Sequence, residues 1–280
     1  MKNLLAFLTA LVICHPAYPA ELFGTIDAIS GKAFVSDRSG KASSISMGQK
    51  IYEGQTIETA SDSEVHLVTE DGGVIALRPG TTFRIDEYSA EGGPADKIFM
   101  SLFKGAMRSI TGWVGKHNTS AYRITTPNAT IGVRGTDHET TVIEKADGDE
   151  PGTYDTVNEG ATLLKTPQGE TEVRRGKFAF VPKNRVVAPF LMTRQPDFWA
   201  RRRLRIEAHI EQRKEFFRGR IEHMREQRIK RLRSSREKQP HGNVRKQEHG
   251  QAAERRLELR EHRLGEAKQF RAARRKKIRE

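Results

Sequence analysis

The sequence predicts a mainly β fold, namely a β-solenoid or β-sandwich domain over residues 21–190 followed by a basic α-helical C-terminal tail. Three observations lead to this prediction. Short β-prone runs alternate with Gly and Pro through residues 21–190, no stretch there has a convincing helical period, and the charge of the chain changes sharply near residue 190. Dense, short, evenly spaced strands are typical of all-β sandwiches, barrels and solenoids.

The first twenty residues have the layout of a secretory signal peptide. Lys2 supplies the positive start, an apolar run follows, and Ala17 and Ala20 provide the small residues of a cleavage site. We therefore expect cleavage after Ala20 and export to the periplasm or the exterior. A retained membrane anchor is the alternative, but the run is shorter than the roughly 20 residues that span a bilayer. Cys14 is the only cysteine, so the mature chain would have no disulfide.

Residues 64–68 and 74–77 are the clearest pair of strands. They flank Glu70-Asp71-Gly72-Gly73, and two β-prone runs across a Gly-rich break predict a hairpin. After a turn at residues 78–81, residues 83–86 alternate apolar and polar side chains, as a half-buried strand does. Further strands are expected at residues 25–29, 33–36, 98–103, 122–125, 140–143, 161–165 and 178–181.

The tail divides into a basic amphipathic helix over residues 191–240 and a second segment over residues 241–280. Pro196 and Asp197 form a plausible helix start, and Phe198 and Trp199 could dock that start onto the β domain. A narrow apolar stripe, as in a coiled coil, follows at Ile206, Ile210, Phe217, Ile221, Met224 and Leu232. Residues 241–280 have few apolar side chains, so we expect them to be partly disordered or helical.

Nearly all of the excess charge lies in this tail. Residues 194–280 hold 29 Lys and Arg against 13 Asp and Glu, a net charge of +16, whereas the preceding residues hold 20 and 23, a net charge of −3. Such a tail binds polyanions in a salt-dependent way. In an exported protein these would be anionic lipid headgroups or surface polymers, so no nucleic acid is expected as a partner. A solvated, salt-bridged spacer helix is the equally weighted alternative.

Two motifs are the most specific part of the sequence. They are residues 104–112 (KGAMRSITG) and residues 126–137 (TPNATIGVRGTD), preceded by residues 71–81 (DGGVIALRPGT). Together they resemble the FecR domain of bacterial envelope proteins, and the resemblance covers residues 24–182. It implies a β-rich periplasmic module. In the regulators that name the family, this module passes a signal from an outer-membrane transporter to a cytoplasmic sigma factor.

Those regulators have a cytoplasmic region and a membrane helix where this chain begins with a signal peptide. We therefore do not expect it to relay a signal inward by itself. The motif residues that we expect to hold the structure or to contact a partner are Gly105, Arg108, Thr126, Pro127, Gly132, Arg134, Gly135, Thr136 and Asp137.

The motif residues also have a direct physical interpretation. Gly132 and Gly135 would allow a positive φ or a close backbone approach. Arg134 could fork onto a carboxylate or backbone carbonyls, and Thr136 and Asp137 could bond nearby amides. A buried ion pair and a turn that hold the strand register account for these residues without a ligand. We favour that structural role over partner contact, for Arg134 and for Arg108 alike.

No catalytic, cofactor or metal site is predicted. His138 and Glu139 stand beside Asp137, but His66 and His117 are too far along the chain to give a metal-ligand spacing. No nucleophile elbow or phosphate-binding loop occurs. His138 also stands where the resembled family usually has an aromatic or apolar residue.

The sequence therefore predicts a non-enzymatic interaction or sensory module that binds an envelope protein or a cell-wall or surface polyanion, with the basic tail as a tether. The alternative is a polyanion- or membrane-surface-binding protein that acts through the tail alone.

Overall fold

A computed structural model describes residues 20–117, 120–146 and 148–201, together with 210–212, 226, 227, 229, 230 and 234. The residues predicted as a signal peptide, most of those predicted as a basic helix and the segment 241–280 lie outside the described residues. Two compact units divide between Ile229 and Lys230, and the fold below belongs to the first. None of its described helices is long and apolar enough to cross a membrane.

The described residues form fifteen strands and two short helices. In chain order they are β1 Leu22–Ser30, β2 Ala33–Ser36, β3 Ala42–Ser44, β4 Lys50–Tyr52, β5 Thr56–Thr59, β6 Glu64–Thr69, β7 Val74–Leu77, β8 Thr82–Ser89, β9 Lys97–Ile110, α1 Trp113–His117, β10 Tyr122–Thr125, β11 Thr130–Ile143, β12 Gly152–Thr166, β13 Gly169–Arg174, β14 Phe178–Pro182, β15 Phe190–Leu191 and α2 Asp197–Arg201.

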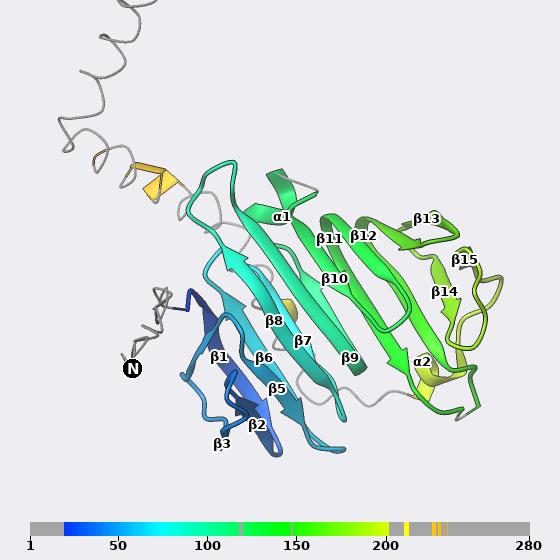
Figure 1. Cartoon of the computed structure of the whole chain (residues 1–280), viewed down its shortest axis with the longest axis horizontal. Coiled ribbons are helices and arrows are strands. Elements are labelled where there is room, and N and C mark those ends of the chain that lie inside the picture. The colour runs from blue at the N-terminus through cyan, green and yellow to red at the C-terminus, as the bar shows by residue number, and fades with distance from the viewer. Residues whose placement is uncertain are drawn as a thin grey trace, which may run out of the picture. The chain divides into compact units, whose positions relative to one another are not determined.

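All strands belong to one open sheet (Figure 1), which confirms the mainly β prediction. Its main path runs β15-β14-β12-β11-β10-β9-β7-β6-β1-β4, while β8, β5, β2 and β3 continue from β9 on a second branch. Among the described strands only β9 and β10 pair in parallel. Stacked solenoid repeats would need parallel pairing throughout, so the mainly antiparallel order does not support the solenoid alternative.

Strand β9 joins the two branches because its two halves have different neighbours. Residues up to Lys104 pair with β8 and β10, and residues from Gly105 onward pair with β7 and β11. Gly105 has a φ of +83°, and a Cβ there would lie 2.5 Å from the Cα of Thr81. Only glycine fits this crowded left-handed position, which gives the motif residue Gly105 a structural role at the branch point.

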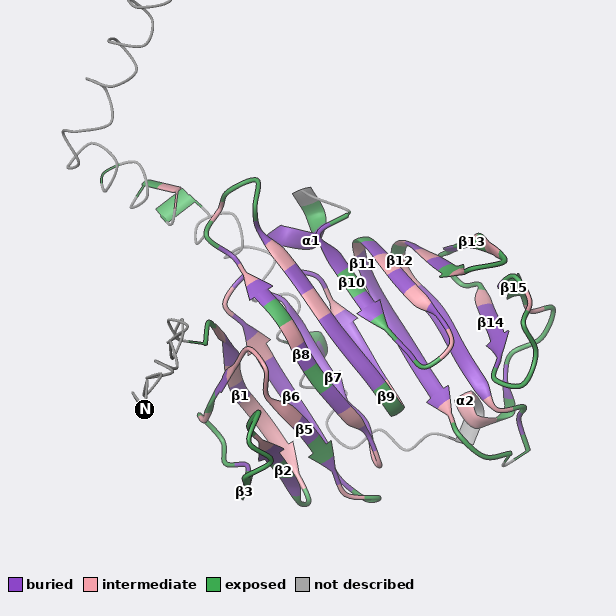
Figure 2. Ribbon diagram, viewed as in Figure 1, coloured by how far each residue is buried: buried purple, intermediate pink, exposed green. Residues whose placement is uncertain are grey.

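The hydrophobic core is one continuous cluster that receives side chains from both branches. Leu67 and Ile75 come from the β6–β7 hairpin, and Phe83, Met100 and Leu102 come from β8 and the first half of β9. All five are at most 1% exposed, and burying each side chain stabilises the fold by roughly 1.5–3 kcal/mol. Figure 2 shows the buried residues running through β6, β7, β9, β11 and β12.

The second halves of β9 and β11 carry a buried layer of charged residues. Arg78 bonds Glu64 at 3.3 Å and Glu139 at 2.9 Å. Arg108 forks onto Asp137, with Nε–Oδ1 2.8 Å and Nη2–Oδ2 2.7 Å. Laterally paired residues share a face of the sheet, and Ala76, Arg108 and Glu139 form one such row.

Residues after β15 contact β12, β14 and the loop between β11 and β12. The carboxylate of Asp149 accepts hydrogen bonds from the backbone N–H groups of Asp197 and Phe198, at 2.9 and 2.7 Å, and so caps α2. Phe198 packs edge-on against Tyr154, and Trp199 packs edge-on against Phe178. The prediction that Phe198 and Trp199 dock the helix start onto the β domain is therefore confirmed.

Further along, Ile210 is 1% exposed, and Glu211 accepts a 2.7 Å hydrogen bond from the Arg108 guanidinium. Glu211 thus adds a second carboxylate, 55% exposed, to the guanidinium of Arg108.

The predicted elements agree with the structure in position more than in length. The hairpin at residues 64–77 is confirmed in register, with Val65 opposite Leu77 and Val68 opposite Val74. The expected runs at 98–103, 140–143 and 161–165 are parts of strands of 14, 14 and 15 residues. The short helix α1 was not predicted, because five residues are too few to establish a helical period.

Candidate binding groove

The residues 126–129 form the tight turn between β10 and β11. The Thr126 hydroxyl donates to the Ala129 carbonyl and accepts from the Ala129 N–H, both at 3.0 Å. Thr153 Oγ1 donates to the same hydroxyl at 2.8 Å. Pro127 follows Thr126 in this turn, and its ring fixes a φ angle that suits the second residue of a β-turn. Thr126 and Pro127 therefore hold the hairpin in which Thr125 pairs with Thr130 and Arg123 pairs with Gly132.

Gly135 breaks the register of β11 against β12. Its φ is +57°, and the pairing shifts between Arg134 and Asp137. On the facing strand, Gly160 has a φ of +79°, and a Cβ there would lie 2.5 Å from the Gly135 carbonyl oxygen. A bulge re-aims the side chains on either side of it. Residues before the bulge therefore belong to a different surface from those after it.

After the bulge, the motif is structural. Asp137 is 1% exposed and Arg108 is 7% exposed, and their bidentate ion pair is completed by Asn158, whose Nδ2 donates to Asp137 Oδ1 at 3.1 Å. Thr136 is also buried, and its carbonyl accepts a 3.0 Å hydrogen bond from the Thr111 N–H. The buried ion pair that we expected from the motif exists, and it uses Arg108.

Before the bulge, the motif faces outward. Arg134 is exposed, and within the described residues it makes no hydrogen bond or ion pair with a carboxylate. The expectation that Arg134 forks onto a carboxylate or carbonyl is therefore not met within the described residues. The cause is the bulge at Gly135, which directs Arg134 and Asp137 to different surroundings.

The backbone role predicted for Gly132 is wrong as well. Gly132 does not have a positive φ, and a Cβ there would find its nearest neighbour, the Leu163 carbonyl oxygen, at 3.8 Å. That is ordinary van der Waals contact, so a larger residue would fit the backbone. What the glycine does is leave the surface bare at the centre of a groove.

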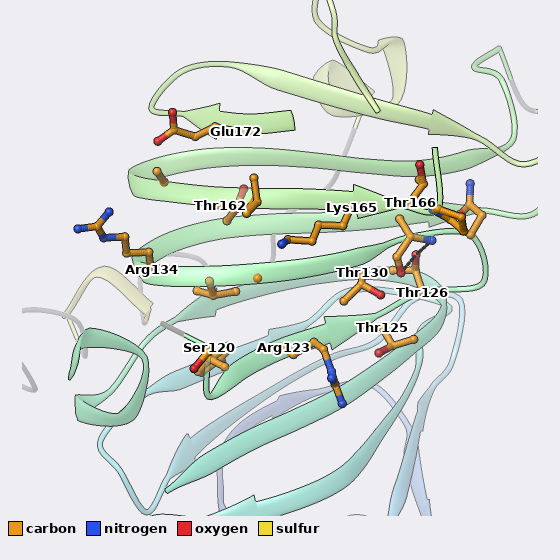
Figure 3. A pocket seen from close by; sticks show the side chains of 18 of the residues that line it. Ser120, Arg123, Thr125, Thr126, Thr130, Arg134, Thr162, Lys165, Thr166 and Glu172 are labelled. Carbon is orange, nitrogen blue, oxygen red and sulfur yellow. Dashed lines mark hydrogen bonds between the residues drawn. The ribbon is translucent and has the colours of Figure 1, made fainter. Parts of the chain in front are cut away.

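That groove lies across the outer surface of β10, β11, β12 and β13, with a cavity volume of about 1120 Å³ (Figure 3). Its floor is formed by the small or apolar residues Gly132, Ala161 and Leu163. Polar side chains surround the floor, and they include Ser120, Arg123, Thr125, Asn128, Thr130, Arg134, Lys165, Thr166 and Glu172. The turn residues Thr126 and Pro127 close one end.

The register of the strands explains this arrangement. Arg123, Gly132, Leu163 and Glu172 form one row, because each pairs with the next across β10, β11, β12 and β13. Thr125, Thr130 and Lys165 form the row on one side of it, and Arg134 and Ala161 form the row on the other. Figure 3 shows the Lys165 side chain extending over the floor toward the end that carries Arg134.

The three cationic side chains of the groove differ in whether they form an ion pair with a carboxylate. Lys165 forms a 2.8 Å ion pair with Glu170, and Glu172 forms one with Arg174 at 2.8 Å. Arg123 and Arg134 have no carboxylate partner among the described residues. Arg123 lies with its guanidinium 3.9 Å from the centre of the Phe99 ring, a cation–π contact that fixes its position. The groove therefore presents two uncompensated positive charges beside a bare floor.

The histidine considered for acid–base or metal chemistry lies elsewhere. His138 is 0% exposed, and its Nδ1 is 3.0 Å from Asp155 Oδ1. The same carboxylate accepts hydrogen bonds from Thr140 and Thr162. This is a buried polar cluster within the sheet, in which His138 Nε2 has no hydrogen-bond partner among the described residues, and His138 itself is not among the groove residues. Within the described residues no group of three His, Cys, Asp or Glu is placed to hold a metal ion.

Most groove residues were not predicted, and among them are Arg123, Leu163, Lys165 and Glu172. The sequence contained a usable signal for the first. In a strand at residues 122–125, the period of two separates Tyr122 and Ile124 from Arg123 and Thr125, and the observed burial follows that alternation. The other three needed the register between β11, β12 and β13, which strand patterning alone does not give.

Comparisons with known proteins found one family and two solved structures that are similar to parts of the chain. The family model described as FecR protein matches residues 55–163, which include β10 and β11 and most of β12. No curated protein matches the chain. Two solved structures of a candidate anti-sigma factor from Parabacteroides distasonis, at 1.65 and 2.50 Å resolution, are similar to it. Each has 14% identity and a TM-score of 0.41, over 52% of this chain and 62% of the other. The chain thus covers less than two thirds of those structures.

Proposed function

The chain carries a FecR domain, and from this premise we propose that it is a non-enzymatic sensory and binding module of the cell envelope. It receives its partner or ligand in the groove over β10–β13. The signal-peptide layout of residues 1–20 supports export to the periplasm or the exterior. The basic tail tethers the module to its site of action.

The observation that carries the proposal is the bare position at Gly132. Glycine in a strand interior is unfavourable by about 0.5–1 kcal/mol relative to alanine, and here neither the φ nor the packing requires it. Glycine within a strand marks a place where a ligand or another backbone approaches closely. Arg123 and Arg134 stand beside that position without carboxylate partners among the described residues, as binding residues do before a partner arrives.

The rival function is binding of a surface polyanion by the tail alone, which the net charge of +16 over residues 194–280 favours. Deletion of residues 241–280 helps to separate the two functions, because it removes a net charge of +7 from the tail and leaves a net charge of +9 in residues 194–240. That truncation leaves Phe198, Trp199 and Ile210 in place, so the β domain keeps its C-terminal contacts.

Site-specific photo-crosslinking in intact cells of the native organism tests the proposal. A photoreactive amino acid replaces Thr125, an exposed residue on the groove side of β10, or Ser43, an exposed residue of β3 outside the groove. We expect a discrete adduct from position 125, none from position 43, and an undiminished adduct in the chain that lacks residues 241–280.

Equal labelling from positions 125 and 43 would refute the groove as the binding surface. An adduct from position 125 that disappears with residues 241–280 would instead support the tail as the binding element.

A further inference from the structure

We propose that the groove binds a carboxylate-bearing linear polysaccharide, with one acid group held over Gly132. This inference rests on the proposed function, since it names the ligand class of the same groove. Three features of the described residues support it: the placement of the cations, the free hydroxyls beside them, and the nature of the floor.

The cations surround the bare position on three sides. Arg123 is opposite Gly132 on β10, Arg134 is two residues farther along β11, and Lys165 lies on β12 in the row of Thr130. Neighbouring strands are about 4.8 Å apart, and residues two apart on a strand are separated by roughly 6.7 Å. A carboxylate above Gly132 is therefore within reach of three long cationic side chains, of which Lys165 already extends over the floor (Figure 3).

Arg123 is prepared for such a contact. Its guanidinium lies 3.9 Å from the centre of the Phe99 ring. This contact fixes the plane of the guanidinium and leaves its N–H groups available to donate hydrogen bonds to a ligand. A planar fork of this kind matches the two oxygens of a carboxylate. Because the side chain is already held, less conformational entropy is lost when the ligand binds.

Hydroxyl groups beside the cations suit the rest of a sugar chain. Thr125 and Thr130 are paired across β10 and β11, and within the described residues their hydroxyls make no hydrogen bond. They form a polar row parallel to the one that holds Arg123 and Gly132. Sugar hydroxyls donate and accept hydrogen bonds, as threonine hydroxyls do, so the two rows complement a polymer that alternates acid and hydroxyl groups.

The floor favours a glycan over an acidic peptide. It is the face of a sheet, and the backbones of β10, β11 and β12 are each paired on both sides. An extended peptide gains affinity chiefly by pairing with a free strand edge, which this floor lacks. A glycan needs only side-chain partners. The volume of about 1120 Å³ exceeds the roughly 300–1,000 Å³ of small-molecule pockets, which leaves room for several sugar units.

A local fluorescent reporter on the full chain tests this inference, because the basic tail would also bind acidic polymers and obscure a global signal. Cys14 is the only cysteine, so Cys14→Ser with Ser120→Cys places one dye on the groove rim. The probes are tetragalacturonate, the neutral maltotetraose and tetraglutamate. We expect saturable binding of tetragalacturonate, with little response to either other probe.

The variant Arg123→Glu with Arg134→Glu should weaken that binding by roughly tenfold or more. The charge-matched control Lys32→Glu with Lys41→Glu changes two exposed lysines outside the groove and should leave binding within about twofold. The Cβ of a residue at position 132 makes only ordinary van der Waals contact, so the variant Gly132→Ile should place its side chain over the floor and abolish binding.

Each other outcome overturns the inference. If maltotetraose bound as tightly as tetragalacturonate, and only Gly132→Ile removed that binding, the groove would be functional but its ligand would be a neutral sugar. Tighter binding of tetraglutamate would mean an acidic peptide. A response unchanged in both groove variants, or no response to any probe, would refute the acidic-glycan site. The crosslink from position 125 in cells is a separate result, so the proposed function stands or falls independently.

Discussion

The two sides of the bulge at Gly135 make different use of the same residue types. On one side, Arg108 and Asp137 are at most 7% exposed and hold the sheet together through a bidentate ion pair. On the other side, Arg134 and Arg123 have no carboxylate partner among the described residues, and they border the bare floor at Gly132. One continuous motif is thus divided into a structural half and a binding half. The comparison teaches that the backbone break decides the role of each arginine.

The largest expected effect comes from removing the buried cation. Arg108→Met leaves Asp137 without its main partner, although Asn158 still donates one hydrogen bond. Breaking a buried ion pair by removing one member costs about 3–5 kcal/mol. The matched change Arg134→Met on the exposed side should cost less than about 0.5 kcal/mol. Urea unfolding of both variants measures the difference, and similar losses would contradict the division of the motif.

A second contrast compares two strand glycines. Gly160→Ala forces a left-handed alanine against the Gly135 carbonyl, which should cost about 2–4 kcal/mol. Gly132→Ala meets no obstacle and should stabilise the fold by about 0.4–1 kcal/mol. The sign of the change in unfolding free energy separates the two positions. A destabilised Gly132→Ala would mean that the glycine serves the fold and not the groove.

A smaller effect is expected where the C-terminal segment is attached. Asp149→Ala removes the cap of α2, and a lost cap costs about 0.5–2 kcal/mol. The consequence should be local, with faster hydrogen exchange at the amides of Asp197 and Phe198. Glu150→Ala is the control in the same loop, because it loses only the exposed pair with Arg185. Equal exchange in both variants would mean that Asp149 does not anchor the segment.

The smallest expected effect is a pH dependence from a buried carboxyl. Burial raises the pKa of Asp71 above its ordinary value of 3.8, although a hydrogen bond from Thr69 acts in the opposite direction. A raised folded-state pKa means that the contribution of Asp71 to stability is largest below about pH 4 and declines as pH rises through the folded-state pKa. The unfolding free energy of Asp71→Asn, relative to the unmodified chain, should therefore increase between pH 4 and pH 7. A difference that stays constant or falls would contradict this assignment.

The sequence was a better guide to the structural half than to the binding half. The hairpin of residues 64–77 and the turn at residues 78–81 depend on local turn chemistry, so they could be predicted. The bidentate pair of Arg108 and Asp137 joins residues 29 apart, and the sequence indicated such a pair without identifying the correct arginine. The groove depends on register: Gly132 lies between Arg123 and Leu163 only because β10, β11 and β12 pair as they do. A shift of one residue would turn every one of those side chains to the other face.

The most direct test of the groove as the binding surface is the yield of the crosslinked adduct from position 125 in cells, compared across three residues at position 132. Alanine adds one methyl group to the floor, whereas isoleucine fills it and still suits a strand. We predict the highest yield with Gly132, a lower yield with Gly132→Ala, and a loss of the adduct with Gly132→Ile at unchanged protein level. An undiminished adduct in Gly132→Ile would contradict the central claim that the bare floor of this groove receives the partner or ligand.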